Sequence, residues 1–163
     1  INYYKKTKKM KKILSIILLL LTINVFSQEG DLKWHTDVNK AIEISIESKK
    51  PIFMFFTGSD WCGWCIRLQK EVFFKPKFVK WAKENLILVE LDFPKRKKLD
   101  QILKQQNENL RQMFGVRGYP TGWFVVPEIE DKKINFKRLG SQGYVAGGPD
   151  NWINGANKIL SKK

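Results

Sequence analysis

One short segment of the chain, residues 52–57, is apolar at successive positions up to Phe56, which is typical of a strand buried on both faces of a covered sheet. Residues 86–92, which begin with an apolar run, are predicted to form a second strand. A third apolar run, residues 123–126, is separated by a polar turn at residues 128–133 from residues 134–139. That pair predicts an antiparallel hairpin, so the pattern indicates four strands.

Apolar residues at helical spacing predict further segments between and after these strands. Thr36 or Asp37 can cap the first helix, which ends before Pro51. The second helix begins at Cys62, and Pro76 interrupts it before an amphipathic pattern continues. The predicted helices cover residues 38–50, 62–75 with a continuation to 81, 102–114 and 149–160, and residues 140–148 are expected to form a loop.

The order of these elements predicts the fold class. Parallel strands separated by helices require right-handed crossovers, whereas the terminal hairpin adds antiparallel neighbours. We therefore expect an α/β fold of three layers, with a central mixed sheet of four to five strands and helices on both faces.

The first residues have the features of a secretory signal peptide. Six lysines precede an apolar stretch at residues 13–26, and Ser27 offers a cleavage position before Gln28. The stretch is shorter than the roughly 20 residues that cross a bilayer. We expect residues 1–27 to be an upstream extension and a signal peptide, with Met10 as the natural start. An uncleaved membrane anchor is the alternative.

Residues 28–163 are then expected to form one exported domain, periplasmic or secreted, with no stable membrane insertion after cleavage. The net charge of +14 includes the six lysines of the leader, so this domain carries about +8. Its basic residues are scattered, apart from the run of Lys95, Arg96, Lys97 and Lys98. No nucleic-acid recognition motif accompanies the run, so we expect a solvated loop and no nucleic-acid partner.

The two cysteines, Cys62 and Cys65, lie three positions apart directly after the first buried strand. A loop so short constrains the unfolded chain little, so a structural disulfide explains the pair poorly. A structural zinc site needs four ligands, and the single histidine, His35, is far away in sequence. We expect no metal and no organic cofactor, and a surface or packing role for His35.

A cysteine at the start of a helix is suited to redox chemistry. The positive end of the helix dipole and the free N–H groups of the first turn stabilise a thiolate, which is the reactive form. Cys62 is therefore the candidate nucleophile. Cys65, one turn further and better covered, is the candidate resolving thiol that closes a disulfide with Cys62.

Two motifs give the chain a resemblance to a known family. Residues 61–65 read Trp-Cys-Gly-Trp-Cys, and residues 115–121 read Gly-Val-Arg-Gly-Tyr-Pro-Thr. Over residues 51–160 the chain resembles the thioredoxin superfamily, which has comparable motifs in the same order. The wording around the cysteines is similar to exported bacterial thioredoxin-like proteins. It is also similar to the C-terminal periplasmic domain of the transmembrane thiol:disulfide interchange reductase.

The resemblance implies a thioredoxin fold and a set of substrate-binding residues. The peptide bond before Pro120 would be cis, which is affordable mainly before proline, and an ordinary trans proline is the alternative. The turn would bring the backbone of Tyr119 beside Cys62, where it can pair with an extended substrate segment. Trp61, Gly63 and Trp64 would complete this surface, although Trp61 can also serve in core packing.

The chain departs from the thioredoxin pattern at two places. Trp64 stands where thioredoxins carry a proline between the cysteines, so the direction of electron flow is open. Thioredoxins also bury an aspartate on the strand before the site, whereas residues 53–56 are all apolar. Asp60 and Glu90 are the candidate proton carriers in its place, and a solvated turn residue is the alternative for Asp60.

These observations predict an exported thiol:disulfide oxidoreductase that acts on protein thiols and disulfides, as a reductase or in disulfide exchange. A membrane electron donor is expected as its partner, because a reductase in an oxidising compartment must be re-reduced. One alternative is an oxidase or isomerase. Another is a peptide-binding or assembly module of the same fold, in which the cysteines are not essential.

Overall fold

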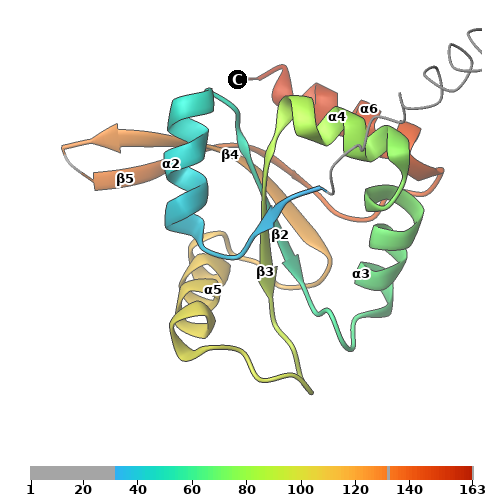
Figure 1. Cartoon of the computed structure of the whole chain (residues 1–163), viewed down its shortest axis with the longest axis horizontal. Coiled ribbons are helices and arrows are strands. Elements are labelled where there is room, and N and C mark those ends of the chain that lie inside the picture. Colours follow the sequence, from blue (N-terminus) through green and yellow to red (C-terminus); the bar gives the residue numbers. More distant parts are fainter. Residues whose placement is uncertain (1–31, 132, 163) are drawn as a thin grey trace, which may run out of the picture. The chain divides into compact units, whose positions relative to one another are not determined.

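The structure is a computed structural model that describes residues 32–131 and 133–162. The expected signal peptide and its cleavage position lie outside the described residues. The elements, most of which are labelled in Figure 1, are β1 (Trp34–His35), α2 (Val38–Ser48), β2 (Ile52–Thr57), α3 (Gly63–Leu68), the π-helical segment η1 (Gln69–Phe73), α4 (Pro76–Asn85), β3 (Ile87–Asp92), α5 (Gln101–Met113), β4 (Thr121–Glu130), β5 (Lys133–Gln142) and α6 (Gly148–Leu160).

The described strands form one mixed sheet in the order β1-β3-β2-β4-β5. β2 is parallel to β3 and antiparallel to β4, and β4 and β5 form the predicted antiparallel hairpin. The sheet therefore has β2 at its centre, and the expected mixed α/β architecture is confirmed.

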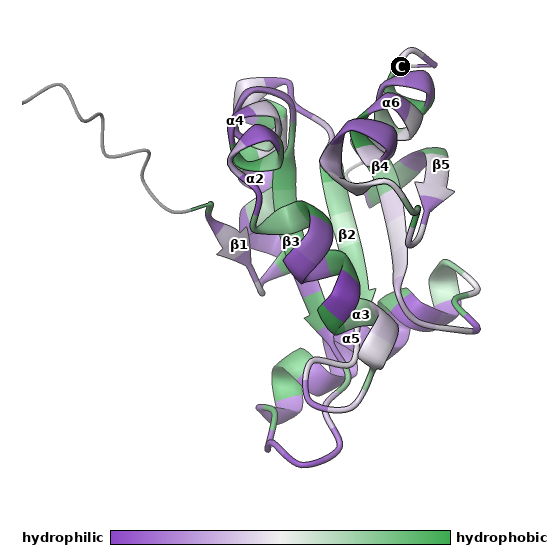
Figure 2. Cartoon of the chain, turned by 90° about the vertical axis from the view of Figure 1, so that its right-hand side faces the viewer, coloured by the Kyte–Doolittle hydropathy of each residue, from purple (hydrophilic) through white to green (hydrophobic). Residues whose placement is uncertain are grey.

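All six residues of β2 are buried, because helices cover both faces of the sheet. Alternate side chains point to opposite faces, so Phe53 and Phe55 join one core, whereas Met54 and Phe56 join the other. Figure 2 shows this strand in the green of hydrophobic residues between the neighbouring elements. One apolar strand therefore supplies the centre of both cores.

The two cores differ in composition and in the helices that close them. α3, η1, α4 and α6 cover the core that contains Phe53, whereas α2 and α5 cover the other (Figure 1). The ring of Phe53 lies 4.8 Å from that of Phe124 and 5.4 Å from that of Trp152, measured between ring centroids. The indole N–H of Trp152 donates to the carbonyl of Gly143 at 3.0 Å, which satisfies its polar atom. Cys65 and Leu68 of α3 pack in this aromatic core, which therefore positions the helix that carries the second cysteine.

The predicted helices and strands are present, but the pattern missed or misplaced four features. β1 was not predicted, because two residues are too short for a periodic signal, and its pairing with Leu88 and Val89 of β3 defines it. In η1 the N–H of Phe74 donates to the carbonyl of Gln69 at 2.9 Å, a spacing that apolar periodicity does not distinguish from an α-helix.

The other two misplaced features are the ends of the hairpin strands. β4 and β5 extend beyond their apolar residues, since backbone pairing continues through polar positions at both ends. β5 thus reaches Gln142, within the expected loop at 140–148.

His35 lies in β1, half-buried at the edge strand. Burial lowers its pKa, and the positive charges of Lys33 and Lys40 lower it further.

Replacing Phe53 by alanine is expected to lower the free energy of unfolding by about 3–5 kcal/mol, because it leaves a cavity in the aromatic core. Urea denaturation of the disulfide-bonded protein measures this change. Phe74→Ala is the matched control, since that side chain is 65% exposed and should change the free energy by less than about 1 kcal/mol. Equal losses in both variants would contradict the assignment of Phe53 to the centre of the core.

Candidate functional site

Cys62 and Cys65 form a disulfide at the start of α3. Cys62 is the N-cap residue of this helix, and its carbonyl accepts the N–H groups of Cys65 and Ile66, each at 3.1 Å. Its Sγ also accepts the Cys65 N–H, with 3.2 Å between nitrogen and sulfur. Cys62 is 6% exposed and Cys65 is fully buried. Cys62 is therefore the more exposed of the two cysteines.

The turn from β2 to Cys62 is held by hydrogen bonds from both sides. The N–H of Cys62 donates to the carbonyl of Gly58 at 2.9 Å. The carboxylate of Asp92, at the end of β3, accepts the N–H of Ser59 at 2.8 Å and its hydroxyl at 2.6 Å. A side chain at residue 58 would place Cβ 2.5 Å from the Trp61 ring, so glycine is required there. Asp92, at the end of β3, thereby holds in place the turn that leads from β2 to the cysteines.

Trp61 links this turn to the Pro120 turn. Its indole N–H donates to the carbonyl of Phe93 at 2.7 Å, and its ring meets the Tyr119 ring edge-on at 5.8 Å between centroids. The Tyr119–Pro120 peptide bond is cis, as the resemblance implied. Tyr119 also packs against the core that contains Cys62 and Cys65. The structure thus brings together the two motifs that lie far apart in the sequence.

Trp64 belongs to a second group of side chains, which we call the Trp64 cluster: Trp64, Arg67, Glu71 and Tyr144. The Trp64 and Tyr144 rings lie 5.1 Å apart, and the guanidinium carbon of Arg67 is 5.3 Å from each ring centroid. Glu71 accepts from the Tyr144 hydroxyl at 2.5 Å and from Arg67 Nε at 2.7 Å. These two bonds, the Tyr144 bond foremost, lower the pKa of Glu71.

The sequence analysis missed three members of the Trp64 cluster. Arg67 and Glu71 have the spacing of an ion pair on one helix face, which was the only local signal. Tyr144 joins them from the far end of the chain. Trp64 itself is 55% exposed. Gly63 is also exposed, and a Cβ there would meet nothing within 4 Å.

Asp60 binds the backbone of the loop that follows β3. Its carboxylate accepts the backbone N–H groups of Lys95, Arg96 and Lys97, at 3.0, 2.7 and 3.0 Å. These bonds, that from Lys95 foremost, lower the pKa of Asp60. A proton carrier needs a pKa nearer to neutral pH, so this environment does not suit Asp60 to that role.

Glu90 has the opposite electrostatics. It lies opposite Phe55 in the β2–β3 register, on the sheet face that α3 covers. Burial raises its pKa, and the nearby Asp92 carboxylate raises it further. Glu90 lines a groove of about 480 Å³ together with Ile66 of α3 and Gln69 of η1. It therefore approaches the cysteine helix from β3, the strand next to the one that carries the aspartate in thioredoxins.

Thr57 is a further buried polar group that the sequence analysis did not single out. It is fully buried at the end of β2, and its alternation with Phe53 and Phe55 places it on the α3 face. Its hydroxyl has no hydrogen-bond partner among the described residues. Threonine at a strand end is common, so no sequence signal marked it.

Within residues 32–131 and 133–162, no group of three or more His, Cys, Asp or Glu side chains is placed to hold a metal ion. In the same ranges, no helix is long and apolar enough to cross a membrane.

Comparisons with known proteins agree with this geometry. A family model described as "Thioredoxin-like domain" matches residues 38–128. The chain is 34% identical over 118 residues to "Disulfide bond reductase DsbH" of Chlamydia pneumoniae, covering 72% of this chain and 70% of that protein. A solved structure of "DsbH Oxidoreductase" superimposes with a TM-score of 0.72 and 30% identity, covering 82% of this chain and 88% of the other.

A second relative matches more of this chain but less of itself. "Thioredoxin-related protein DsbJ" of Chlamydia pneumoniae is 29% identical over 151 residues, which are 90% of this chain and 42% of that protein. The chain therefore spans less than half the length of this relative.

Replacing Glu90 by glutamine is expected to stabilise the protein at neutral pH and to matter less below pH 4. The raised pKa means that the unfolded chain releases this proton first, so ionisation lowers the stability of the wild type as pH rises past 4.5. Urea denaturation at pH 4 and pH 7 measures the difference, and Glu84→Gln, which removes an exposed carboxylate, is the control. A stability difference independent of pH would contradict the shifted ionisation.

Proposed function

Because the chain belongs to the thioredoxin-like domain family and is a thiol:disulfide oxidoreductase, we propose that it reduces or exchanges disulfides of other proteins after export from the cytoplasm. The observation that carries this proposal is the Cys62–Cys65 disulfide, with Cys62 reachable at the start of α3 and Cys65 buried behind it. The family supports the chemistry, and the relative named a disulfide bond reductase supports the reducing direction.

The proposed reaction begins from the reduced dithiol. The Cys62 thiolate attacks one sulfur of a protein disulfide, which forms a mixed disulfide and releases the first substrate thiolate. Cys65 then loses its proton and attacks Cys62 Sγ. This step breaks the mixed disulfide, releases the second substrate thiolate and closes the Cys62–Cys65 bond. Two electrons pass from the enzyme dithiol to the substrate, so a dithiol electron donor, which we place in the membrane, must reduce the enzyme again.

The remaining site residues have proposed roles in this sequence of steps. The backbone of Tyr119, positioned by Pro120, would pair with an extended substrate segment beside Cys62. Trp61, Gly63 and Trp64 would form the surface that the substrate covers, since all three are exposed. Glu90 is the proposed acceptor of the Cys65 proton, because it is half-buried on the α3 face with a raised pKa.

The export part of the proposal rests on the leader. Residues 1–27 have the order of a signal peptide, in which basic residues precede a short apolar segment and a small residue at the cleavage position. We propose cleavage after Ser27 and a periplasmic or secreted domain.

Replacing Cys62 by serine is expected to abolish catalysed reduction of insulin disulfides, because no thiolate remains to begin the exchange. Cys65→Ser is expected to accumulate the mixed disulfide, which non-reducing electrophoresis detects. Circular dichroism of both variants controls for folding. Full activity of Cys62→Ser would disprove the assignment. If the wild type binds peptides without reducing disulfides, and the double variant Cys62→Ser with Cys65→Ser binds them equally well, the protein is a binding module.

The direction of electron flow is tested by the reduction potential of the Cys62–Cys65 pair. We expect a value near that of thioredoxin, about −270 mV, if the protein is a reductase. Equilibration with defined ratios of reduced and oxidised dithiothreitol or glutathione measures it. A value near that of DsbA, about −120 mV, would instead identify an oxidase.

A further inference from the structure

A loop with four consecutive basic residues is fixed beside the redox disulfide. We call Lys95, Arg96, Lys97 and Lys98, which lie between β3 and α5, the basic loop. Asp60, two positions before Cys62, accepts three of its backbone N–H groups. The ammonium of Lys95 lies 4.1 Å from the ring centroid of Trp61, the residue directly before Cys62. We call residues 58–62, which lead from β2 to the disulfide, the redox turn. The basic loop is therefore attached to the redox turn through both its backbone and a side chain.

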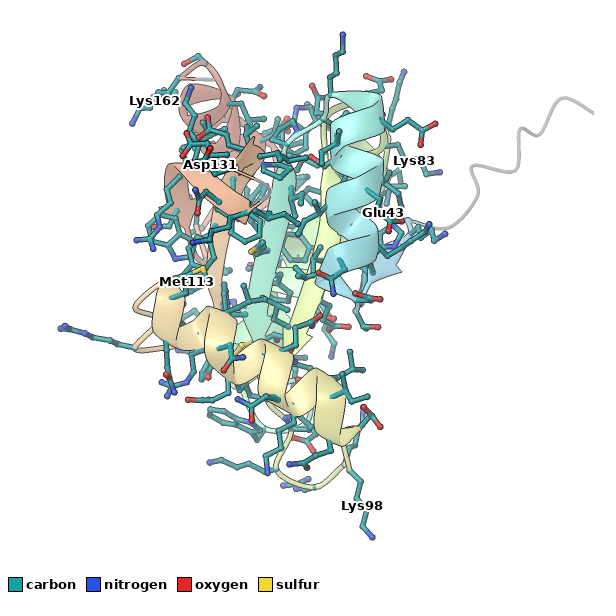
Figure 3. The ribbon with its side chains drawn as sticks, turned by 90° about the vertical axis from the view of Figure 1, so that its left-hand side faces the viewer. Glu43, Lys83, Lys98, Met113, Asp131 and Lys162 are labelled. Carbon is teal, nitrogen blue, oxygen red and sulfur yellow. A yellow bond between two sulfur atoms is a disulfide. The ribbon has the colours of Figure 1, made fainter. Side chains whose placement is uncertain are left out.

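The four cations of the basic loop are available to a partner. All four side chains are exposed, and none belongs to an ion pair among the residues that the structure describes. In Figure 3, Lys98 projects from the end of the molecule opposite to Lys162 and Asp131. Asp60 binds backbone groups, so it does not engage the charged ends of these side chains.

The carboxylates near the loop are held by groups other than its charged side chains. Asp60 receives three backbone N–H groups of the loop, and Asp92 receives the N–H and hydroxyl of Ser59. Asp100 accepts the N–H groups of Ile102 and Leu103, and Glu108 forms an ion pair with Arg111. Glu90 is half-buried, and burial raises its pKa.

We propose that the basic loop binds an acidic segment that flanks the disulfide of a protein partner. The proposal rests on the proposed function, because a partner disulfide must approach Cys62 Sγ closely enough for sulfur exchange. Residues beside that disulfide then pass over Trp61 and the basic loop, where acidic side chains gain favourable electrostatic interactions. The loop is attached to the redox turn, which favours a protein partner over an anionic membrane. Binding to a membrane does not require the cations to lie next to a cysteine, whereas binding the residues beside a partner's disulfide does.

The test uses two synthetic peptides that contain the same internal disulfide, flanked by glutamates in one and glutamines in the other. The full chain is reduced, freed of reductant and mixed with each peptide, and acid-quenched samples are separated to give the rate of peptide reduction. For the wild type at low ionic strength we expect the acidic peptide to react about tenfold faster. This preference should fall to about twofold in 0.5 M sodium chloride, since salt screens exposed charges.

Two double variants separate the loop from the total charge of the protein. Arg96→Gln with Lys98→Gln should reduce the preference to about threefold, in line with the modest strength of each exposed pair. Lys133→Gln with Lys162→Gln removes the same charge from exposed positions elsewhere and should keep it near tenfold. Lys95 and Lys97 stay unchanged, because Lys95 contacts Trp61 and Lys97 acts on Glu90. Equal rates with the glutamine peptide show that the redox chemistry is intact.

Other results would contradict either the proposed function or the role of the basic loop. No reduction of either peptide by the wild type would overturn the proposed function itself. Equal rates for both peptides, or an equal loss of preference in both double variants, would overturn only the role of the basic loop. Sedimentation with vesicles of anionic phospholipid that depends on Arg96 and Lys98, without any peptide preference, would also overturn it in favour of a membrane contact.

Discussion

The burial of β2 on both faces is the constraint on which the rest of this structure depends. A strand with five successive apolar residues, Ile52 to Phe56, cannot lie at an edge or face solvent without exposing about half of them. It therefore takes the centre of the sheet, with β3 and β4 as its neighbours and helices on both sides. Since the redox turn starts where this strand ends, the position of Cys62 follows from the packing of Phe53 and its neighbours.

Carboxylates near the cysteines mainly fix the backbone. Asp92 holds Ser59, and Asp60 holds the basic loop. Hydrogen bonds from N–H groups to an ionised carboxylate are stronger than those between neutral groups, so two short carboxylates can hold two segments without secondary structure. Glu90 differs because it is half-buried on the α3 face, where desolvation raises its pKa. The two carboxylates that bind backbone N–H groups thus differ in environment from Glu90, the acid that we propose as the proton acceptor.

The disulfide lies between two aromatic and cationic groups of different origin. On one side Trp61 contacts Tyr119 and Lys95, and on the other the Trp64 cluster joins α3 and η1 to the segment after β5. Trp64 stands where thioredoxins carry a proline, and its contacts with Arg67 and Tyr144 restrain it. The two tryptophans next to Cys62 are therefore both in contact with cations, Trp61 with Lys95 of the basic loop and Trp64 with Arg67.

Most of the elements and the chemistry could be predicted from the sequence, because both depend on residues close together in the chain. Apolar runs identified β2 and β3, and two cysteines after a buried strand identified the redox pair. The sequence also pointed to the Pro120 turn through resemblance. Tertiary structure alone decided the pairs that are distant in sequence. β1 exists because β3 is beside it, and Tyr144 joins Glu71 from the end of the chain. Asp60 became an anchor because the connector after β3 folds back onto the redox turn, and local pattern contains no information on such a contact.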